Sequence, residues 1–281
     1  MSSKIRTVAL ASGEAVPVLG QGTWGMGEHR SRRTAEITAL RVGLDLGMTL
    51  IDTAEMYGSG GAEEVVGEAI SGRRAGVFLV SKVLPRHATR RGTVAACHAS
   101  LKRLGTDRID VYLLHWRETV PLAETLEALE TLSQSGDIRS WGVSNFDTAD
   151  MKELVGLPGG TAVATDQVLY NLTRRGIEFD LLPWCRKRQI PVMAYSPIEQ
   201  GRVLENEVVR RVALRQNRTP AQVALAWVVE QQGVVAIPKS SNPDHVRQNR
   251  EALDVQLTGD DLEELNHEFP PPTRKASLEM I

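Results

Sequence analysis

Apolar residues along this chain gather into short runs that are separated by longer segments of mixed polarity. The runs are almost continuously apolar rather than alternating, which is typical of parallel strands covered by helices on their outer face. We predict eight strands, at residues 16–22, 49–53, 77–82, 109–115, 140–145, 165–170, 191–197 and 234–239.

Segments in which apolar residues recur at a helical spacing lie between these runs. We predict helices at residues 31–47, 61–71, 89–105, 121–136, 221–232 and 242–253, with shorter helical stretches after the fifth and sixth strands. Strands that alternate with helices are joined by right-handed crossovers, and such strands form a parallel sheet.

Eight strand–helix repeats in 281 residues predict an α/β fold, a closed (β/α)8 TIM barrel. An open sheet of eight or nine strands is the alternative. The segment IRTVALASGEAVPV, with a turn at Ser12–Gly13, predicts a β-hairpin at the barrel bottom. The proline-rich tail at 270–281 is expected to wrap the surface, and its shortness predicts an open pocket. No linker divides the chain, so we expect one domain over residues 1–281.

Composition and charge argue against several classes of protein. A net charge of −2 gives no electrostatic reason to expect a nucleic acid or an anionic membrane as partner. No apolar run approaches the ~20 residues of a membrane span, and the first residues lack the apolar core of a signal peptide. With only two cysteines, Cys97 and Cys185, a cytoplasmic location is expected. The histidines match no metal-binding spacing, so we expect no metal.

The stretch GQGTWG at residues 20–25 matches the glycine pattern of dinucleotide-binding folds. That pattern has this meaning only where a helix opens directly after the strand. The following residues show no helical periodicity until about Ser31. We therefore interpret the stretch as a glycine-rich loop after the first strand, in which Trp24 walls a pocket.

Four ionisable residues lie at or just after the ends of three neighbouring predicted strands. Asp52 ends the second strand and Tyr57 follows it, while Lys82 ends the third and His115 the fourth. Each residue alone has an ordinary structural explanation, such as capping a turn or bonding within the core. In a barrel, however, the carboxyl ends of the strands converge on one site, so their joint position indicates catalysis.

This set of side chains suits the donation of a proton to a carbonyl oxygen. A phenol is a poor acid near neutral pH, with an ordinary pKa of about 10, and a neighbouring ammonium favours its ionised form. A carboxylate keeps the ammonium charged and in place, and an imidazole holds the carbonyl oxygen by a hydrogen bond. None of these groups supplies electrons, so the reaction needs a hydride donor.

Asp52, Tyr57, Lys82 and His115, in this order, resemble the catalytic tetrad of the aldo-keto reductases. The stretches GTWGMG, IDTAEMYG, LVSKV, LLHW, GVSNF, DQVLYN, AYSP and IPKSSNPDHVRQN are similar to blocks of that family. The resemblance runs from about residue 5 to 270 and is strongest to bacterial enzymes of the methylglyoxal-reductase type. It implies NADPH-dependent reduction of small aldehydes or ketoaldehydes to alcohols, with Tyr57 as the proton donor.

The resemblance also implies a nicotinamide cofactor, NADPH or NADP+, across the barrel mouth. Tyr195 would stack on the nicotinamide, and its carboxamide would bind Ser144, Asn145 and Gln167. Further contacts implied are Gly22, Thr23 and Trp24 after the first strand, Ser196, Pro197 and Ile198 at the pyrophosphate, Lys239, Ser240 and Asn242 at the 2′-phosphate, and Gln248 and Asn249 at the adenine. A loop after strand eight that leads into a helix is a suitable anion site in its own right.

His245 stands where many family members have an arginine. Histidine is largely uncharged at neutral pH and binds less well to phosphate, so a weaker preference for NADPH over NADH is expected. Trp24, Met56 and Trp116 are candidates for the wall of the substrate pocket. The resemblance favours a monomer.

Two rival functions use the same residues. Lys82 is also the residue type that forms a Schiff base in lyases and aldolases. A redox-sensing protein of the same fold would hold NADPH tightly and turn over slowly. The chain contains no G-x-S-x-G motif, which argues against an α/β-hydrolase. Cys97 and His98 are neighbours on a predicted helix and point apart, so they form no nucleophilic dyad.

Overall fold

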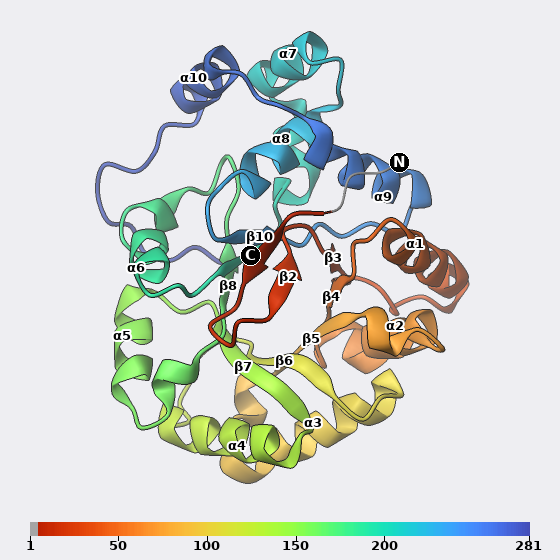
Figure 1. Ribbon diagram of the computed structural model, residues 1–281, viewed down its shortest axis with the longest axis vertical. Coiled ribbons are helices and arrows are strands. Elements are labelled where there is room, and N and C mark those ends of the chain that lie inside the picture. The colour runs from red at the N-terminus through yellow and green to blue at the C-terminus, as the bar shows by residue number, and fades with distance from the viewer. Residues whose placement is uncertain (1–4) are drawn as a thin grey trace.

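The computed structural model describes residues 5–281, in which eight parallel strands curl around a common axis inside a ring of helices (Figure 1). Hydrogen bonds join each strand to the next in chain order. The strands are β3 (Gln21–Gly22), β4 (Leu50–Asp52), β5 (Phe78–Val83), β6 (Ile109–Leu114), β7 (Ile138–Ser144), β8 (Asp166–Leu169), β9 (Val192–Tyr195) and β10 (Val234–Ala236). Parallel bridges between Leu19 and Ala236 and between Gly22 and Lys239 close the sheet. The closed barrel is confirmed, and the open sheet was wrong.

Glycines of the GQGTWG stretch allow the first and last strands to meet. A Cβ atom on Gly22 would lie 2.7 Å from the carbonyl oxygen of Ile237, and one on Gly20 would lie 2.5 Å from Leu50 Cδ2. Gly22 N–H donates to the carbonyl oxygen of Pro238 at 3.0 Å. Gly22 therefore serves close backbone approach at the closure of the barrel, whereas Gly20 leaves room for Leu50 of β4.

Eight of the helices in the described chain correspond to predicted segments. They are α1 (Arg33–Asp45), α2 (Gly61–Ile70), α3 (Arg90–Leu104), α4 (Leu122–Ser135), α5 (Thr148–Gly156), α6 (Leu181–Lys187), α8 (Pro220–Val229) and α9 (Pro243–Glu251). Local chemistry sets several ends. The side chain of Thr219 accepts from Gln222 N–H in a capping box, with Pro220 at the first helical position. Gly136 ends α4 at φ +84°, a conformation that favours glycine.

Two further helices, α7 (Glu207–Arg215) and α10 (Gly259–Glu268), were not predicted. They lie side by side outside the ring, where Arg215 pairs with Asp261 at 2.5 Å. Short 3-10 turns connect many elements, namely η1 (Arg30–Arg32), η2 (Tyr57–Gly60), η3 (Arg74–Gly76), η4 (Pro85–His87), η5 (Gly160–Ala162), η6 (Gly176–Glu178), η7 (Glu199–Glu205) and η8 (Ala252–Asp254). Among the described residues, no helix is both long and apolar enough to cross a membrane.

The N-terminal hairpin consists of β1 (Thr7–Ala9) and β2 (Ala15–Pro17), which pair antiparallel. Gly13 makes the turn at φ +82°. The prediction of a single strand at 16–22 was wrong. Its first residues pair with β1, and only Gln21–Gly22 joins the barrel. The hairpin prediction is otherwise confirmed, apart from residues 1–4, which lie outside the described chain.

The apolar core has two layers. Inward-pointing side chains such as Leu50, Val80 and Leu113 fill the barrel, and Leu10 and Val16 of the hairpin pack against them from below. A larger layer lies between the strands and the helices. Side chains alternate between the two faces of a strand, so a residue two positions after an inward-pointing one also points inward. Asp52, Lys82 and His115 stand two positions after Leu50, Val80 and Leu113. At the carboxyl ends of the strands those inward residues are polar, and they form the site described below.

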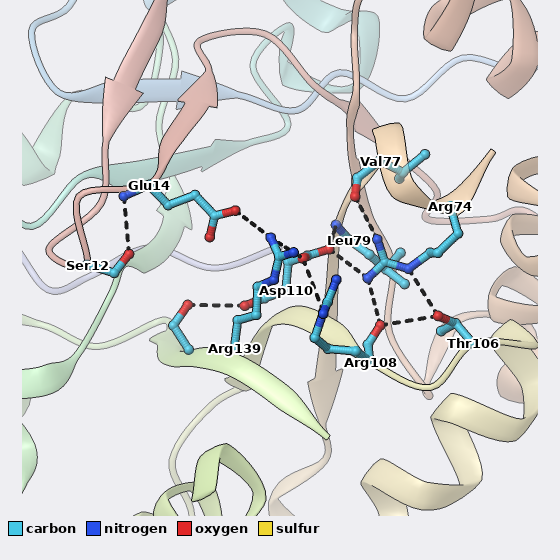
Figure 2. Close-up of polar contacts among 10 residues, drawn as sticks. Ser12, Glu14, Arg74, Val77, Leu79, Thr106, Arg108, Asp110 and Arg139 are labelled. Atoms are coloured by element: carbon cyan, nitrogen blue, oxygen red, sulfur yellow. Dashed lines mark hydrogen bonds and ion pairs between the residues drawn. The ribbon is translucent and has the colours of Figure 1, made fainter. Parts of the chain in front are cut away.

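A cluster of charged residues lies at the opposite end of the strands (Figure 2). The carboxylate of Asp110, at the start of β6, is 1% exposed and pairs with Arg74 at 2.8 Å and with Arg139 at 3.1 Å. It also accepts a hydrogen bond from Leu79 N–H at 2.8 Å. Arg139 pairs in turn with Glu14 of the hairpin at 2.7 Å. This cluster therefore ties three strands and the hairpin together at the barrel bottom.

The C-terminal tail, residues 270–281, follows α10 without regular structure. It wraps past α6, where Lys275 pairs with Asp180 at 3.1 Å and Leu278 packs against the outer core. In Figure 1 the C-terminus is drawn beside β10. The backbone of its last residue, Ile281, hydrogen-bonds the hydroxyl of Tyr195 at the end of β9. The tail therefore wraps the surface and also reaches the barrel mouth, and the open pocket stays a prediction.

Candidate active site

Three of the four predicted catalytic residues form one hydrogen-bonded group at the carboxyl ends of β4 and β5. Lys82 Nζ donates to Asp52 Oδ2 at 2.8 Å, to the carbonyl oxygen of Thr53 at 2.9 Å and to Tyr57 Oη at 3.2 Å. The lysine side chain is 0% exposed and that of Asp52 3%. An ammonium has three protons, so each is matched to an acceptor and the group is fixed in space.

Gln167 supports the same group from the other side of the barrel. Its Nε2 donates to Asp52 Oδ1 at 2.8 Å, so both oxygens of the buried carboxylate are occupied. Thr23 Oγ1 donates to the carbonyl oxygen of Asp52 at 2.9 Å. Sequence reasoning placed Gln167 and Thr23 with the cofactor and missed these bonds, because nothing in the local sequence shows which strand faces Asp52.

Burial and charge keep Tyr57 protonated. Burial raises the pKa of Tyr57, the ammonium of Lys82 lowers it, and the carboxylate of Asp52 raises it again, with a net increase. Burial lowers the pKa of Lys82. Asp52 and Tyr57 together raise it by more than burial lowers it, so the net shift is upward. At neutral pH the pair is thus a phenol beside an ammonium. The expected lowering by Lys82 is present but is outweighed by burial.

His115 lies beside this group as a neutral imidazole. Burial and the nearby charge of Lys82 lower the pKa of His115 to about 2. Its ring meets the ring of Tyr57 edge to face, with centroids 5.7 Å apart. Within the described residues, its buried Nδ1 has no hydrogen-bond partner. All four predicted catalytic side chains are therefore brought together.

Residues predicted to hold a nicotinamide carboxamide converge at the ends of β7, β8 and β9. Tyr195 Oη donates to Asn145 Oδ1 at 3.0 Å, and Asn145 Nδ2 donates to the carbonyl oxygen of His115 at 3.1 Å. Ser144 Oγ donates to the carbonyl oxygen of Gln167 at 2.8 Å. Asn145 has φ +60°, an uncommon conformation for a residue with a side chain. The ring of Tyr195 is half-buried beside the tetrad.

The loop after β9, residues 196–201, contains three more residues in the left-handed region, Ser196 at φ +48°, Glu199 at +50° and Gln200 at +54°. Pro197 is buried, and Ile198 is partly buried. Strained backbone of this kind persists only where its surroundings hold it, and it is common at functional sites.

Glu199 is the residue that holds this loop. Its carboxylate is 4% exposed and accepts from Asn171 Nδ2 at 2.7 Å, from Arg174 Nε at 3.0 Å and from Arg202 at 2.8 Å. Burial raises the pKa of Glu199, but these donors lower it overall, so the side chain is ionised. Neither Glu199 nor Arg174 was predicted to be functional, because their pairing joins separate loops.

The predicted phosphate and adenine contacts lie at the start of α9. Lys239 and His245 are exposed, and Ser240 Oγ accepts from Asn242 N–H at 3.1 Å. The side chain of Asn242 caps the helix by accepting from Asp244 N–H at 2.8 Å. Further along the helix, Gln248 is half-buried and Asn249 is buried.

The predicted wall of the substrate pocket is partly open to solvent. Trp24 is 56% exposed and Met56 is 42% exposed, although both are large apolar residues. The ring of Trp116 packs edge to face on His115 with centroids 4.9 Å apart, and its Nε1 donates to Glu118 at 3.0 Å. Apolar rims of this kind are typical of binding sites. In the described part of the chain, no three His, Cys, Asp or Glu side chains gather as a metal site would require.

Glu55, in the IDTAEMYG stretch, was also not predicted to matter. Its buried Oε1 accepts from Leu84 N–H at 2.7 Å and lies 2.9 Å from His87 Nδ1. The carboxylate therefore turns away from the tetrad and fixes the loop after β5 to the loop that carries Tyr57.

The chain belongs to the aldo/keto reductase family, whose family model matches residues 18–267. It is 54% identical to methylglyoxal reductase YeaE of Escherichia coli strain K12, over 95% of this chain and 96% of that one. It is 34% identical to a glyoxal reductase of Bacillus subtilis strain 168, over 92% and 91% of the two chains. Among solved structures, an aldo-keto reductase from Klebsiella pneumoniae in complex with NADPH superposes with a TM-score of 0.97 at 51% identity, covering 99% of this chain and 100% of that one.

Proposed function

We propose that this protein reduces small aldehydes and ketoaldehydes, such as methylglyoxal, to alcohols with NADPH. The observation that carries the proposal is the contact of Lys82 Nζ with Tyr57 Oη at 3.2 Å, within a buried group that has no other evident purpose. Relatives named methylglyoxal reductase and glyoxal reductase support the substrate class. The half-exposed Trp24 and Met56 support a small apolar pocket beside Tyr57.

The residues around the mouth fit a nicotinamide dinucleotide. Asn145, Gln167 and Ser144 present amide and hydroxyl groups suited to a carboxamide, and the half-buried ring of Tyr195 offers a flat apolar surface. At the start of α9, an exposed ammonium on Lys239 lies beside a helix N-terminus, and this combination suits a phosphate. The Klebsiella relative that superposes on this chain was solved with NADPH.

In the proposed mechanism, the bound cofactor supplies the hydride that the carbonyl carbon receives. Tyr57 Oη then gives its proton to the carbonyl oxygen as negative charge develops there. The ammonium of Lys82, fixed by Asp52 at 2.8 Å, stabilises the phenolate that remains. His115 is neutral, so it can orient the carbonyl oxygen by a hydrogen bond without competing as an acid. Tyr57 is reprotonated from solvent before the next turnover.

The Schiff-base rival requires Lys82 to act as a neutral amine. The ammonium is instead held by three acceptors, and the net shift of its pKa is upward. Borohydride treatment in the presence of methylglyoxal should therefore trap no adduct on Lys82. The redox-sensing rival uses the same tetrad and differs only in rate, so turnover of methylglyoxal is the measurement that separates it.

The test of the proposal is the variant Tyr57→Phe. Removing a positioned general acid typically costs 10²–10⁴-fold in rate, so methylglyoxal reduction should fall by about that factor. NADPH binding, measured by quenching of protein fluorescence, should change little, because the phenol is proposed to contact the substrate. Turnover at the wild-type rate in the folded variant would remove Tyr57 from this role.

We also propose that the protein acts as a cytoplasmic monomer. All four tetrad side chains come from one chain, so no second copy is needed to complete the site. Cys97 and Cys185 are both buried and free, which suits a reducing compartment. Light scattering after size-exclusion chromatography tests the oligomeric state, and a dimer mass would contradict it.

A further inference from the structure

Arg174 joins two segments that meet at the barrel mouth. It lies in the turn after β8, where Asn171 Oδ1 accepts from its backbone N–H at 3.1 Å. Its Nε donates to Glu199 of loop 196–201 at 3.0 Å, and its Nη1 donates to Glu279 of the C-terminal tail at 2.5 Å. One guanidinium thus holds both segments through separate nitrogens, a use to which its rigid fork is well suited.

Loop 196–201 depends on such an anchor. Three of its residues with side chains have positive φ, which costs free energy that neighbouring contacts must offset. Asn171 holds the beginning of the loop by donating to the carbonyl oxygen of Ser196 at 2.9 Å and also bonds Glu199. Arg174 and Arg202 complete the set around the same carboxylate. Arg202 differs in one respect, because it donates to Gln200 and Glu199 of this loop and is not hydrogen-bonded to the described tail.

The tail brings a further contact to the same place. Beyond Glu279, the backbone of Ile281 hydrogen-bonds the hydroxyl of Tyr195, which itself donates to Asn145. Met280 and Ile281 are about half-exposed apolar residues. The chain end therefore lies against Tyr195, which is proposed to stack on the nicotinamide. Arg174 connects the tail to the loop proposed to lie along the pyrophosphate.

We propose that Arg174 is a positioning residue that couples the C-terminal tail to loop 196–201, so that both close over the bound cofactor and slow its release. This rests on the proposed function, since it takes the cofactor to lie along that loop. Release of the cofactor then requires the loop and the tail to open together. Breaking the link lets either segment open alone, which leaves affinity for the carbonyl substrate untouched but shortens the lifetime of the complex.

The experiment measures the rate of NADPH release by stopped-flow fluorescence, with excess NADP+ to prevent rebinding. The variant Glu279→Gln breaks only the tail arm of Arg174, and its side chain is 46% exposed, so folding is not at risk. Ion pairs of this exposure contribute about 0.2–1 kcal/mol, so release should become about 1.4- to 5-fold faster. The matched control is Glu230→Gln, which breaks an exposed pair with Arg6 far from the mouth and should leave release unchanged.

A double-mutant cycle of Arg174→Gln and Glu279→Gln tests the link itself. If the two residues act through one contact, the double variant should release NADPH no faster than Arg174→Gln alone, because the tail arm is already lost. A second readout needs no turnover: NADPH should protect Met280 and Ile281 from carboxypeptidase in the unmodified protein, and protect them less in Glu279→Gln.

Two negative results have different meanings. Unmodified protein that fails to bind NADPH would overturn the proposed function and this inference with it. NADPH binding with equal release rates in Glu279→Gln, Glu230→Gln and the unmodified protein would overturn the inference alone. Strictly additive effects of Arg174→Gln and Glu279→Gln would likewise show that no coupling runs through their contact.

Discussion

Two buried aspartates at opposite ends of the barrel are surrounded by cations in different ways. At the mouth, Asp52 pairs with one lysine, whose remaining protons reach a backbone carbonyl and the phenol of Tyr57. At the bottom, Asp110 pairs with Arg74 and Arg139, and a backbone N–H fills in beside them. Both carboxylates are almost fully buried, so burial alone does not distinguish them.

The difference lies in where each set of bonds ends. The bottom cluster ends on groups that belong to the framework, namely two strands and the hairpin residue Glu14 (Figure 2). The mouth cluster ends on a hydroxyl beside a half-exposed rim. A buried ion pair whose hydrogen bonds lead out to a reactive atom suits catalysis, whereas one whose bonds end on the backbone and on framework side chains suits structure.

The largest effect is expected from breaking the mouth cluster at its cation. Lys82→Met removes the charge that stabilises the phenolate, so kcat/KM for methylglyoxal should fall by about 10²–10⁴-fold. Asp52→Asn should do less, because the carboxylate only orients and compensates the lysine. NADPH absorbance over a range of pH measures both. A larger loss in Asp52→Asn than in Lys82→Met would count against this assignment.

Breaking the bottom cluster should affect stability and not rate. Asp110→Ala leaves Arg74 and Arg139 without their shared carboxylate, and loss of one partner of a buried pair costs about 3–5 kcal/mol. Both arginines are partly exposed, at 21% and 43%, so a value of about 2–3 kcal/mol is expected after solvent screening. Urea denaturation measures it. An unchanged denaturation midpoint, or a lost kcat in the folded variant, would contradict the assignment of the bottom cluster to stability and of the mouth cluster to catalysis.

Lys239 is a third cation to compare with Lys82 and the arginines of the bottom cluster, because it lies at the mouth but is exposed. Lys239→Ala should weaken NADPH binding by about 1 kcal/mol, or roughly fivefold, since a charge-assisted bond to phosphate is lost at a solvated site. NADH binding should barely change. His245→Arg should tighten NADPH binding for the same reason. Dissociation constants from fluorescence quenching decide this, and equal losses for both cofactors would show that Lys239 does not contact the 2′-phosphate.

The smallest effect is expected at Asp166, a buried carboxyl group on the outer face of β8. Burial raises its pKa well above the usual range, and the nearby carboxylates of Asp150 and Asp147 raise it further, against the weaker opposing effect of a hydrogen bond from the Phe146 backbone. The folded state thus keeps a proton that the unfolded state loses above about pH 4. Stability should therefore fall as pH rises above that value, towards the folded pKa.

Asp166→Asn should remove this dependence, because asparagine carries no titrating proton. The stability of the variant relative to the unmodified protein should grow between pH 6 and pH 8, because only the unmodified protein then loses stability through this carboxyl group. Urea denaturation at the two pH values measures the difference. A constant difference across that range would mean that Asp166 is already ionised in the folded protein.

The parts of the fold and site that could be predicted are those that depend on local pattern. The eight apolar runs were each found because a buried strand must be apolar, and they placed Asp52, Lys82 and His115 at one end of the barrel. The single strand predicted at 16–22 is two strands in the structure. Its first residues pair with β1 in the hairpin, and an apolar run does not show which partner each residue pairs with. Helices α7 and α10 escaped prediction because each is an additional helix that the alternation of strand and helix does not require.

Contacts between distant segments could not be predicted from one sequence. Gln167 reaches Asp52 across 115 positions, and Arg174 reaches Glu279 across 105. Neither pair is marked by any local signal, since glutamine, arginine and glutamate are ordinary surface residues. The lowered pKa expected for Tyr57 failed for a similar reason, because the depth of burial that outweighs Lys82 is a property of the folded barrel.

The position of Ile281 matters for how this protein is produced and attached to surfaces. The N-terminal hairpin packs under the barrel, whereas the last residue lies against Tyr195 at the opposite face. A purification tag, fluorescent fusion or immobilisation linker joined after Ile281 would start at the rim of the reactive opening, next to Tyr195. Extensions are better placed before the hairpin, and enzymes assayed with a C-terminal tag should be compared with an untagged preparation.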